Sequence, residues 1–139
     1  MEFHKLKLNE LDQCCKLVED NFSPEHAKAF RHQAALKKGH DFYTLSDSTD
    51  ILACGAFTFS PCDDSTVESY FVCVKQNEQR KGLGFELMNN MIAIAKQDET
   101  IDFCIQVCKK HLVPMYEKLN FFVLHEKSNG EFLMGMKLR

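Results

Sequence analysis

The sequence contains no Trp, only three Pro among 139 residues, and no two cysteines in a Cys-x-x-Cys arrangement. Its seven Cys are odd in number, and several lie within apolar runs, where a free thiol packs as a small hydrophobic group. This pattern argues against a disulfide framework and is typical of a reducing compartment, so we expect a cytoplasmic protein. Twelve Phe in the absence of Trp predict a core rich in phenylalanine.

An excess of positive charge is also missing. Lys and Arg number 17 against 20 Asp and Glu, which gives a formal net charge of -3 and an isoelectric point near 6.1. A general nucleic-acid binder is expected to carry a basic face, so we predict no nucleic-acid partner. The first ten residues alternate between apolar and polar side chains, and we expect neither a signal peptide nor a membrane span.

Metal-ligand spacing is absent as well. The six His show no i, i+4 pair on a predicted helix and form no cluster with Cys, so we predict no metal site. The sequence does contain 45% apolar and 27% charged residues, without repeats or low-complexity segments. This balance is typical of an ordered protein, and the length suits one domain, which we place at 1–139.

Apolar periodicity predicts seven strands and four helices in the order β-α-α-β-β-β-α-β-α-β-β. The strands are expected at 3–8, 41–45, 51–59, 66–74, 101–107, 121–125 and 132–138. The helices are expected after Asn9, after Ser23, from Leu83 and over 113–119. The third helix has the clearest apolar stripe, and the last two strands form a hairpin through the turn at Asn129-Gly130.

Local signals predict the ends of the first two helices. Asn9 is expected to cap the first helix. Ser23 is expected to cap the second, with Pro24 at its first position. Gly39 is a natural C-terminal signal, so we expect the second helix to end there.

A glycine-bearing turn, Gln79-Arg80-Lys81-Gly82-Leu83-Gly84, connects the strand at 66–74 to the third helix. At the start of a helix the backbone N–H groups lack partners and the helix dipole is positive, which suits a phosphate group. Gly82 and Gly84 would let a ligand approach the backbone closely, and Arg80 and Lys81 add positive charge. The turn therefore predicts an anion site for a nucleotide-like cofactor.

Two common phosphate motifs do not fit this turn. A dinucleotide fingerprint needs a third glycine where Leu87 stands. A P-loop needs Ser or Thr directly after Gly-Lys, and the turn has neither. Alternatively, the two glycines only build a connection between strand and helix and bind nothing.

The turn resembles the Q/R-x-x-G-x-G/A signature of the GCN5-related N-acetyltransferase (GNAT) family. A second similarity lies at Met115-Tyr116-Glu117-Lys118-Leu119-Asn120-Phe121, which resembles the family's Tyr-Glu-Lys-Leu-Gly-Phe. Asn120 stands where the family has Gly, and Asn is the next best residue for a left-handed helix exit. The predicted element order also resembles the family's topology along essentially the whole chain. The resemblance implies an α/β (α+β) fold with a mixed central sheet flanked by helices.

The resemblance further implies acetyl-coenzyme A (acetyl-CoA) as co-substrate, held in a wedge between the strand at 66–74 and the strand at 101–107. Its pantetheine arm would pair with the backbone at the end of the first of these strands, and its pyrophosphate would lie on the turn. The residues implied in cofactor binding are Val72, Cys73, Val74, Gln79, Arg80, Lys81, Gly82, Leu83, Gly84 and Phe85.

Glu68 and Tyr116 are the candidate catalytic residues. An amine that attacks a thioester must lose a proton, and Glu68 lies where histone-acetylating members of the family carry a catalytic Glu. Strand alternation would place Glu68 on the same face as Tyr70 and Val72, unless a bulge intervenes. In the family, a Tyr at the position of Tyr116 protonates or hydrogen-bonds the coenzyme A sulfur. Alternatively, Glu68 is a solvent-facing strand residue and Tyr116 a packing residue.

The expected function is transfer of an acetyl group from acetyl-CoA to a primary amine of a small molecule, peptide or protein. Transfer would be direct, because no His pairs recognisably with Cys73 and a Cys in an apolar strand is usually inert. Two alternatives stay open: a catalytically silent domain that binds acetyl-CoA as a sensor or structural partner, and an interaction module without a cofactor. The resemblance leaves the acceptor open and permits a homodimer.

The acceptor cleft is expected between residues 22–43 and the turn at 128–131. Four side chains of the first segment would either line this cleft or belong to the core. They are Phe22, Phe30, His32 and Phe42.

Overall fold

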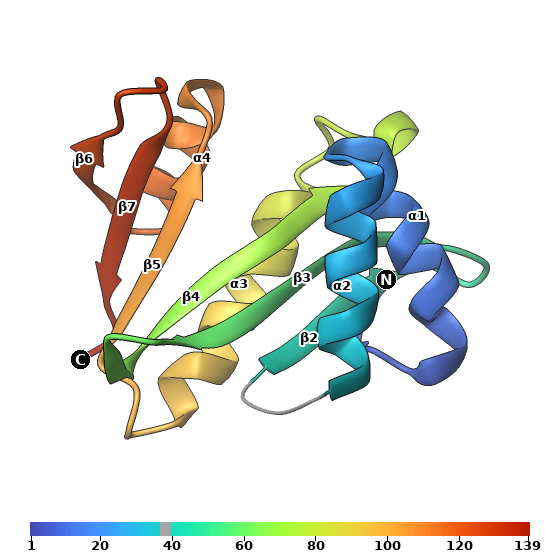
Figure 1. Cartoon of the computed structure of the whole chain (residues 1–139), viewed down its shortest axis with the longest axis horizontal. Helices are drawn as coiled ribbons and strands as arrows, with labels where there is room; N and C mark the ends of the chain where they lie inside the picture. The colour runs from blue at the N-terminus through green and yellow to red at the C-terminus, as the bar shows by residue number, and fades with distance from the viewer. Residues whose placement is uncertain (37–39) are drawn as a thin grey trace.

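A mixed sheet of seven strands crosses the molecule in the order β1-β2-β3-β4-β5-β7-β6 (Figure 1). The computed structural model describes residues 1–36 and 40–139. The strands are β1 (Glu2–Lys5), β2 (His40–Ser46), β3 (Ile51–Ser60), β4 (Asp63–Val74), β5 (Phe103–Cys108), β6 (Phe122–Glu126) and β7 (Phe132–Lys137). Neighbouring strands are antiparallel except β4 and β5, which are parallel.

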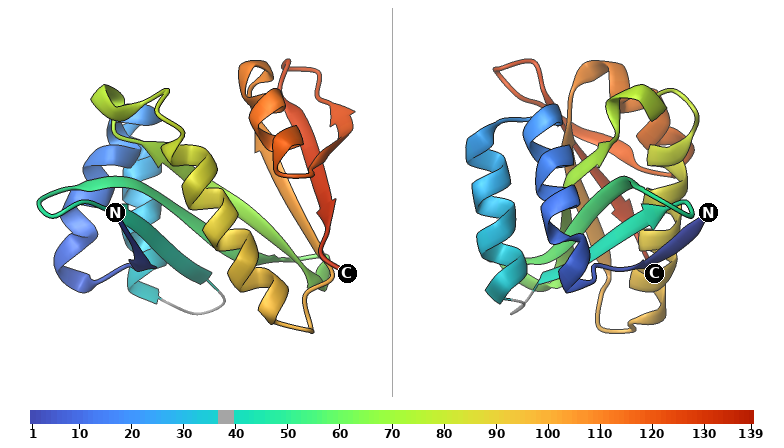
Figure 2. Two further views of the ribbon diagram at one scale, coloured as in Figure 1. Left: turned by 180° about the vertical axis from the view of Figure 1, so that it is seen from behind. Right: turned by 90° about the vertical axis from the view of Figure 1, so that its right-hand side faces the viewer.

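The described residues form four α-helices, which cover the sheet unevenly (Figure 2). They are α1 (Leu11–Asn21), α2 (Pro24–Leu36), α3 (Leu83–Gln97) and α4 (Val113–Lys118). α1 and α2 pack on one side of β2, β3 and β4, and α3 packs on the other side of the same strands. α4 lies on the α3 side of β5, β7 and β6 (Figure 2). We call the two sides of the sheet the α1/α2 face and the α3/α4 face.

Apolar side chains on both faces of the central strands form a two-sided core. In β3, residues 51–57 are all buried, as expected for a strand that has helices on both faces. Leu87 and Met91 of α3 are 0% exposed and pack on one face, whereas Cys14 and Val18 of α1, also 0% exposed, pack on the other. The layered arrangement therefore explains both the continuous apolar run of β3 and the apolar stripe of α3.

The two parallel strands separate along their length. β4 pairs with β5 over residues 66–69, which lie opposite 103–106. Beyond Ser69 the backbones of the two strands diverge (Figure 1), and we call the region between them the wedge. One edge of the last residues of β4 therefore has no neighbour among the described strands.

A bulge in β4 coincides with this divergence. From Cys54 to Ala56, β3 advances two positions, while the partner positions in β4 run from Cys73 to Tyr70 and span three. β4 therefore contains one extra residue here. Phe71 lies within the bulge and has a φ of 56°. The extra residue reverses the direction of every side chain that follows it in β4.

The predicted order of strands and helices is confirmed, but the expected cap of the first helix is wrong. α1 is preceded by a 3-10 turn (Leu8–Glu10), and Glu10 rather than Asn9 is its N-terminal cap position. The Glu10 carboxylate accepts a hydrogen bond from the N–H of Lys7 at 2.8 Å, which orders the turn before the helix begins.

Two other local expectations are confirmed. The Ser23 hydroxyl accepts a hydrogen bond from the N–H of His26 at 3.0 Å and so caps α2. Asn120, which follows α4, has a φ of 71°, the left-handed geometry expected where the family has Gly. The expected end of α2 at Gly39 lies outside the described residues.

Candidate active site

The turn from β4 to α3 presents backbone donors that have no partner within the helix. Gly82 precedes α3 with a φ of 82°, and Arg80 has a φ of 66°, so the chain enters the left-handed region twice. The first helical hydrogen bond runs from the N–H of Glu86 to the carbonyl of Gly82 at 3.0 Å. The N–H groups of residues 83–85 therefore have no helical acceptor. Together with the helix dipole they form a site that suits an anion.

The side chains of this turn differ in what they offer a ligand. Leu83 is 6% exposed and packs in the core, which leaves its backbone for a ligand. Lys81 pairs with Glu78 at 2.9 Å, whereas Arg80 is exposed and forms no ion pair within the described part of the chain. The Phe85 ring is exposed at the start of α3. Arg80 is therefore the cation best placed to meet a phosphate group.

Gly84 faces the gap between the end of β4 and α4. A Cβ atom at this position would lie 3.6 Å from the sulfur of Met115 and 3.6 Å from a methyl carbon of Val74. These are ordinary van der Waals distances, so the protein's own packing does not require glycine here. The absence of a side chain instead keeps open the place where the turn meets the wedge.

Two side-chain amides hold the turn against α1. The Asn21 amide donates to the carbonyls of Leu17 at 2.8 Å and Val74 at 3.1 Å, and its oxygen accepts from Gln79 at 3.0 Å. Gln79 also donates to the Val74 carbonyl at 3.2 Å. Sequence reasoning assigned Gln79 to the cofactor and missed Asn21 entirely. The structure gives the Gln79 amide a bracing role, and its contact with a cofactor stays a prediction.

We call the hydrogen bonds that Asn21 and Gln79 form with each other and with Val74 the brace, and Asn21→Ala is expected to remove those of Asn21. Hydrogen bonds of this kind each contribute about 1 kcal/mol, so we expect the free energy of unfolding to fall by about 1–3 kcal/mol. The turn becomes less well ordered, and coenzyme A affinity should fall about three- to tenfold. Urea denaturation and calorimetric titration measure the two effects. Asn90→Ala is the control, because it removes an amide-to-carbonyl bond within α3, to Glu86 at 2.8 Å. Equal losses of affinity in both variants would contradict a specific role for the brace.

Val72 and Val74 form the open edge of β4. The N–H of Lys75 donates to the carbonyl of Leu52 in β3 at 2.8 Å. Alternate residues of a strand direct their peptide groups to the same side, so those of Cys73 also face β3. The intervening peptide groups face the wedge. Of the three backbone contacts predicted for the pantetheine arm, this alternation favours those of Val72 and of the Val74 N–H, because the Val74 carbonyl already accepts from Asn21 and Gln79.

The thiol of Cys73 is turned away from the wedge. Its sulfur lies 3.7 Å from that of Cys54, in the core beneath α1 and α2. Hydrogen bonds with the thiols of Cys14 and Cys73, together with burial, raise the pKa of Cys54 well above its ordinary value. A buried thiol cluster of this kind is a poor source of nucleophiles. The arrangement supports the expectation that no acyl-enzyme forms at Cys73.

Glu68 lies on the α1/α2 face of β4, beside the wedge. Tyr70, two residues further on, packs against the core beneath α1 and α2, and Glu68 is the register neighbour of Ile105 in β5. Glu68 and Tyr70 share a face as predicted, but Val72 does not, because the bulge on which the prediction was conditional is present. The bulge at Phe71 turns the Val72 side chain to the α3/α4 face, where it packs against the core beneath α3.

Tyr116 lies in α4 with its ring in the core. The residue is 2% exposed, and its ring packs edge-on against Phe121 with the centroids 5.4 Å apart. Its hydroxyl forms no hydrogen bond to any described residue. Burial, with smaller contributions from Cys108 and Cys104, raises the pKa of the phenol well above its ordinary value. The phenol is therefore held in its protonated form, which is the form that can donate to a thiolate.

Two of the four residues considered for the acceptor cleft belong to the core. Phe30 and Phe42 are 1% and 7% exposed, and their rings pack edge-on with the centroids 5.0 Å apart. Phe22 and His32 are exposed on the surface. Of the four, only Phe22 and His32 are therefore accessible to an acceptor, and their part in a cleft stays a prediction.

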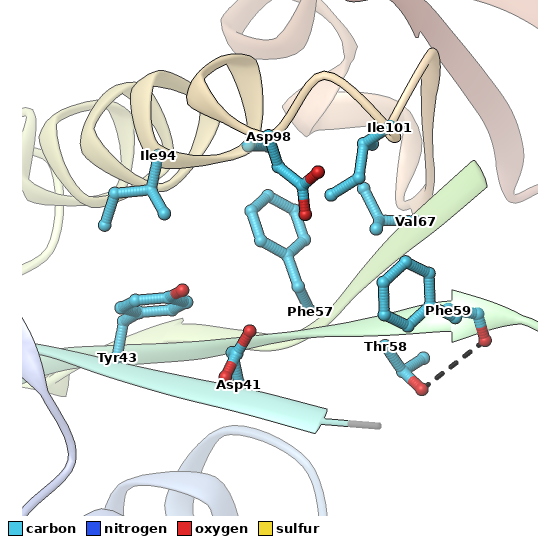
Figure 3. Close-up of a pocket in the computed structure, with 10 residues that line it drawn as sticks. Asp41, Tyr43, Phe57, Thr58, Phe59, Val67, Ile94, Asp98 and Ile101 are labelled. Atoms are coloured by element: carbon cyan, nitrogen blue, oxygen red, sulfur yellow. Dashed lines mark hydrogen bonds between the residues drawn. The ribbon is translucent and has the colours of Figure 1, made fainter. Parts of the chain in front are cut away.

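A separate cavity of about 80 Å³ lies between the C-terminal part of α3 and the sheet (Figure 3). Asp41 and Asp98 contribute carboxylates to its lining, but both have other partners. Asp41 pairs with Lys5 at 3.7 Å, and Asp98 accepts from the Thr100 hydroxyl at 2.6 Å. Because this cavity is at the opposite end of α3 from Gly82, it is not part of the anion site.

Residues 1–36 and 40–139 offer no metal site and no membrane-spanning helix. These residues contain no group of three His, Cys, Asp or Glu side chains arranged to hold a metal ion. None of the described helices is both long and apolar enough to cross a membrane. The turn at 79–84 and the adjoining wedge are therefore the strongest candidate for a functional site.

Comparison with known proteins bears on this site. The model of the Acetyltransferase (GNAT) family matches residues 6–121. No curated protein sequence matches significantly. Tetrahymena GCN5 is 16% identical with a TM-score of 0.77, over 100% of this chain and 97% of that one. An aminoglycoside 6'-N-acetyltransferase complexed with coenzyme A is 11% identical with a TM-score of 0.83, over 100% and 98%. The ribosomal-protein-S18-alanine N-acetyltransferase from Escherichia coli is 14% identical with a TM-score of 0.80, over 99% and 93%.

Proposed function

Since the chain belongs to the acetyltransferase (GNAT) family, we propose that it transfers the acetyl group of acetyl-CoA directly to a primary amine. The observation that carries this proposal is the set of N–H groups at 83–85 that lack a helical acceptor, in the turn that follows the unpaired end of β4. A structural neighbour with the same fold is complexed with coenzyme A. The pyrophosphate would lie on these N–H groups beside Arg80, and the thioester would extend into the wedge toward Glu68.

The chain supplies a group for each step of direct transfer. Glu68 would accept a proton from the amine, directly or through a water molecule. The N–H of Val74 would stabilise the oxyanion that forms when the amine attacks the thioester carbon. Tyr116 would donate its proton to the departing thiolate. The amide product and free coenzyme A then carry all the atoms of the reactants.

Release of free coenzyme A tests this function. Acetyl-CoA and the protein are mixed with a panel of primary amines, and the thiol produced is measured. We expect amine-dependent release well above the rate of hydrolysis without amine. Tight binding of acetyl-CoA without release for any amine would support the silent sensor instead. Failure to bind coenzyme A at all would leave the interaction module.

Glu68→Gln is expected to lower kcat/KM about tenfold at neutral pH, because the amide cannot accept the proton and water replaces it poorly. The deficit should shrink as the pH approaches about 10, since a growing fraction of an alkylamine is already neutral there. The measurement is kcat/KM as a function of pH. Glu99→Gln, an exposed Glu in the turn after α3, is the control. Wild-type turnover of the Glu68 variant across the whole pH range would exclude Glu68 as the base.

All seven cysteines of the structure are free thiols. A chain with many unpaired cysteines is typical of a reducing compartment. We therefore place the protein in the cytoplasm, with acetyl-CoA and an amine as its partners.

A further inference from the structure

The β5, β7 and β6 strands carry no described helix on the α1/α2 face. α1 and α2 pack on β2, β3 and β4, and α4 lies on the opposite side (Figures 1 and 2). The strand registers bring six large apolar side chains to this uncovered side. They are Phe103, Ile105, Val107, Phe122, Leu124 and Leu133, which we call the apolar face.

A glycine at the centre makes this apolar face continuous. Gly135 lies between Ile105 of β5 and Phe122 of β6 in the strand registers. A Cβ atom there would lie 2.6 Å from the ring of Phe103 and 2.9 Å from Leu124, so these two side chains lean across the glycine. The rings of Phe103 and Phe122 are 6.2 Å apart. Phe122 and Leu124 nevertheless remain 44% exposed, which is unusual for a packed apolar cluster.

The apolar face begins at the candidate base. Glu68 is the register neighbour of Ile105, so its carboxylate lies at the border between β4 and the apolar face. The registers place Lys137 of β7, opposite Phe103, and His125 of β6, opposite Leu133, at the two ends of this face, and β5, β6 and β7 bring no carboxylate to it. A ligand that reaches Glu68 therefore has one anion for its amine and hydrocarbon for the rest of its body.

We propose that the acceptor is a primary amine carried on a single aryl or alkyl group, which packs on the apolar face while the amine meets Glu68. The inference rests on the proposed function and specifies its acceptor. An ammonium group complements the charge of Glu68, and an aryl or alkyl group complements the neighbouring apolar face. Together these two features favour a hydrophobic monoamine. A polycation such as a polyamine or an aminoglycoside would bring further ammonium groups onto hydrocarbon and near Lys137, where they would lose hydration without a partner.

A graded series of acceptors tests the inference. We compare ethylamine, butylamine, hexylamine and phenethylamine with spermidine, and measure kcat/KM by coenzyme A release. Burial of one methylene group corresponds to roughly a fourfold gain, so kcat/KM should rise by about fifteenfold for each two methylenes. Phenethylamine should match or exceed hexylamine, and spermidine should fall below butylamine.

Two neighbouring residues of β6 provide matched variants. Phe122→Ser removes an exposed ring from the apolar face and is expected to lower kcat/KM for hexylamine about tenfold, with ethylamine unaffected. Val123→Ser is the control: Val123 is 42% exposed, but it is in register with Met134, whose side chain packs on the α3/α4 face. It should leave both acceptors unaffected.

The outcomes separate this inference from the function on which it rests. A preference for ethylamine or spermidine over hexylamine overturns the inference and leaves the acetyltransferase in place. Coenzyme A release with none of the amines overturns both. Sedimentation adds a third outcome: a dimer that Phe122→Ser dissociates, with acceptor preference unchanged, would assign the apolar face to a second copy of the chain and overturn the inference.

Discussion

Gly82→Asp is expected to fold normally and to bind coenzyme A more than about a hundredfold more weakly than the wild type. A Cβ atom at this position meets no atom within 4 Å, so the new side chain has space. The φ of 82° costs a residue other than glycine about 1–2 kcal/mol, and Asp tolerates this geometry better than most. Its carboxylate would stand beside the N–H groups of 83–85, where a diphosphate is to bind. Two like charges about 4 Å apart repel by roughly 4 kcal/mol in a partly desolvated site.

Gly82→Asn is the matched control for this variant. The Asn side chain has the same shape and the same tolerance of left-handed geometry but carries no charge. We expect it to weaken binding only a few-fold, and calorimetric titration with coenzyme A measures both variants. Thermal unfolding should show similar stabilities, because only the charge differs. If both variants bind like the wild type, the turn is not the cofactor site.

Sequence reasoning succeeded where local and tertiary signals coincide. The start of α3 at Leu83 was predicted correctly, because a glycine turn and an apolar stripe of helical period meet at that residue. The hairpin between β6 and β7 was also predicted, and Gly130 has the positive φ, 87°, that its turn signal indicates. In such segments the residues nearby in sequence determine the structure.

The bulge at Phe71 has no comparable local signal. A positive φ is unfavourable for an aromatic residue, and contacts distant in sequence compensate for it. The Phe71 ring packs edge-on against Phe30 of α2, 5.3 Å away, and the Tyr70 hydroxyl donates to Gln33 at 2.7 Å. Because these contacts join β4 to a helix about 40 positions earlier, strand alternation alone put Val72 on the wrong face.

The brace and the apolar face were missed for a related reason. Asn21 and Gln79 are separated by 58 positions, and no spacing rule connects them. The apolar side chains of β5, β6 and β7 were recognised as strand residues, but a sequence does not show which side of a sheet the helices leave uncovered. A sequence likewise does not show which aromatic side chains a helix buries, so Phe30 could be assigned either to the cleft or to the core. Its 1% exposure places it in the core.

Tyr116→Phe is expected to lower kcat by about a hundredfold or more and to leave coenzyme A affinity unchanged. A positioned general acid typically contributes a factor of about 10²–10⁴, and the variant removes only the hydroxyl. The ring keeps its edge-on packing against Phe121, so the free energy of unfolding should stay close to that of the wild type. Steady-state kinetics with a saturating amine, together with calorimetric titration of coenzyme A, separates the chemical step from binding.

Tyr43→Phe is the control, because Tyr43 shares the burial of Tyr116 but lies away from the wedge. Tyr43 is 2% exposed in the core beneath α3 and borders the cavity of Figure 3; burial, with a smaller effect of Asp41, raises its pKa to about 12. Its hydroxyl can be removed without touching the proposed chemistry, so turnover should not change. Because the pKa of the Tyr116 phenol is raised, the hydroxyl stays protonated at pH values where an ordinary tyrosine loses its proton. Wild-type turnover should therefore not fall as the pH approaches about 10. Wild-type kcat in the Tyr116 variant would leave this residue with a packing role alone.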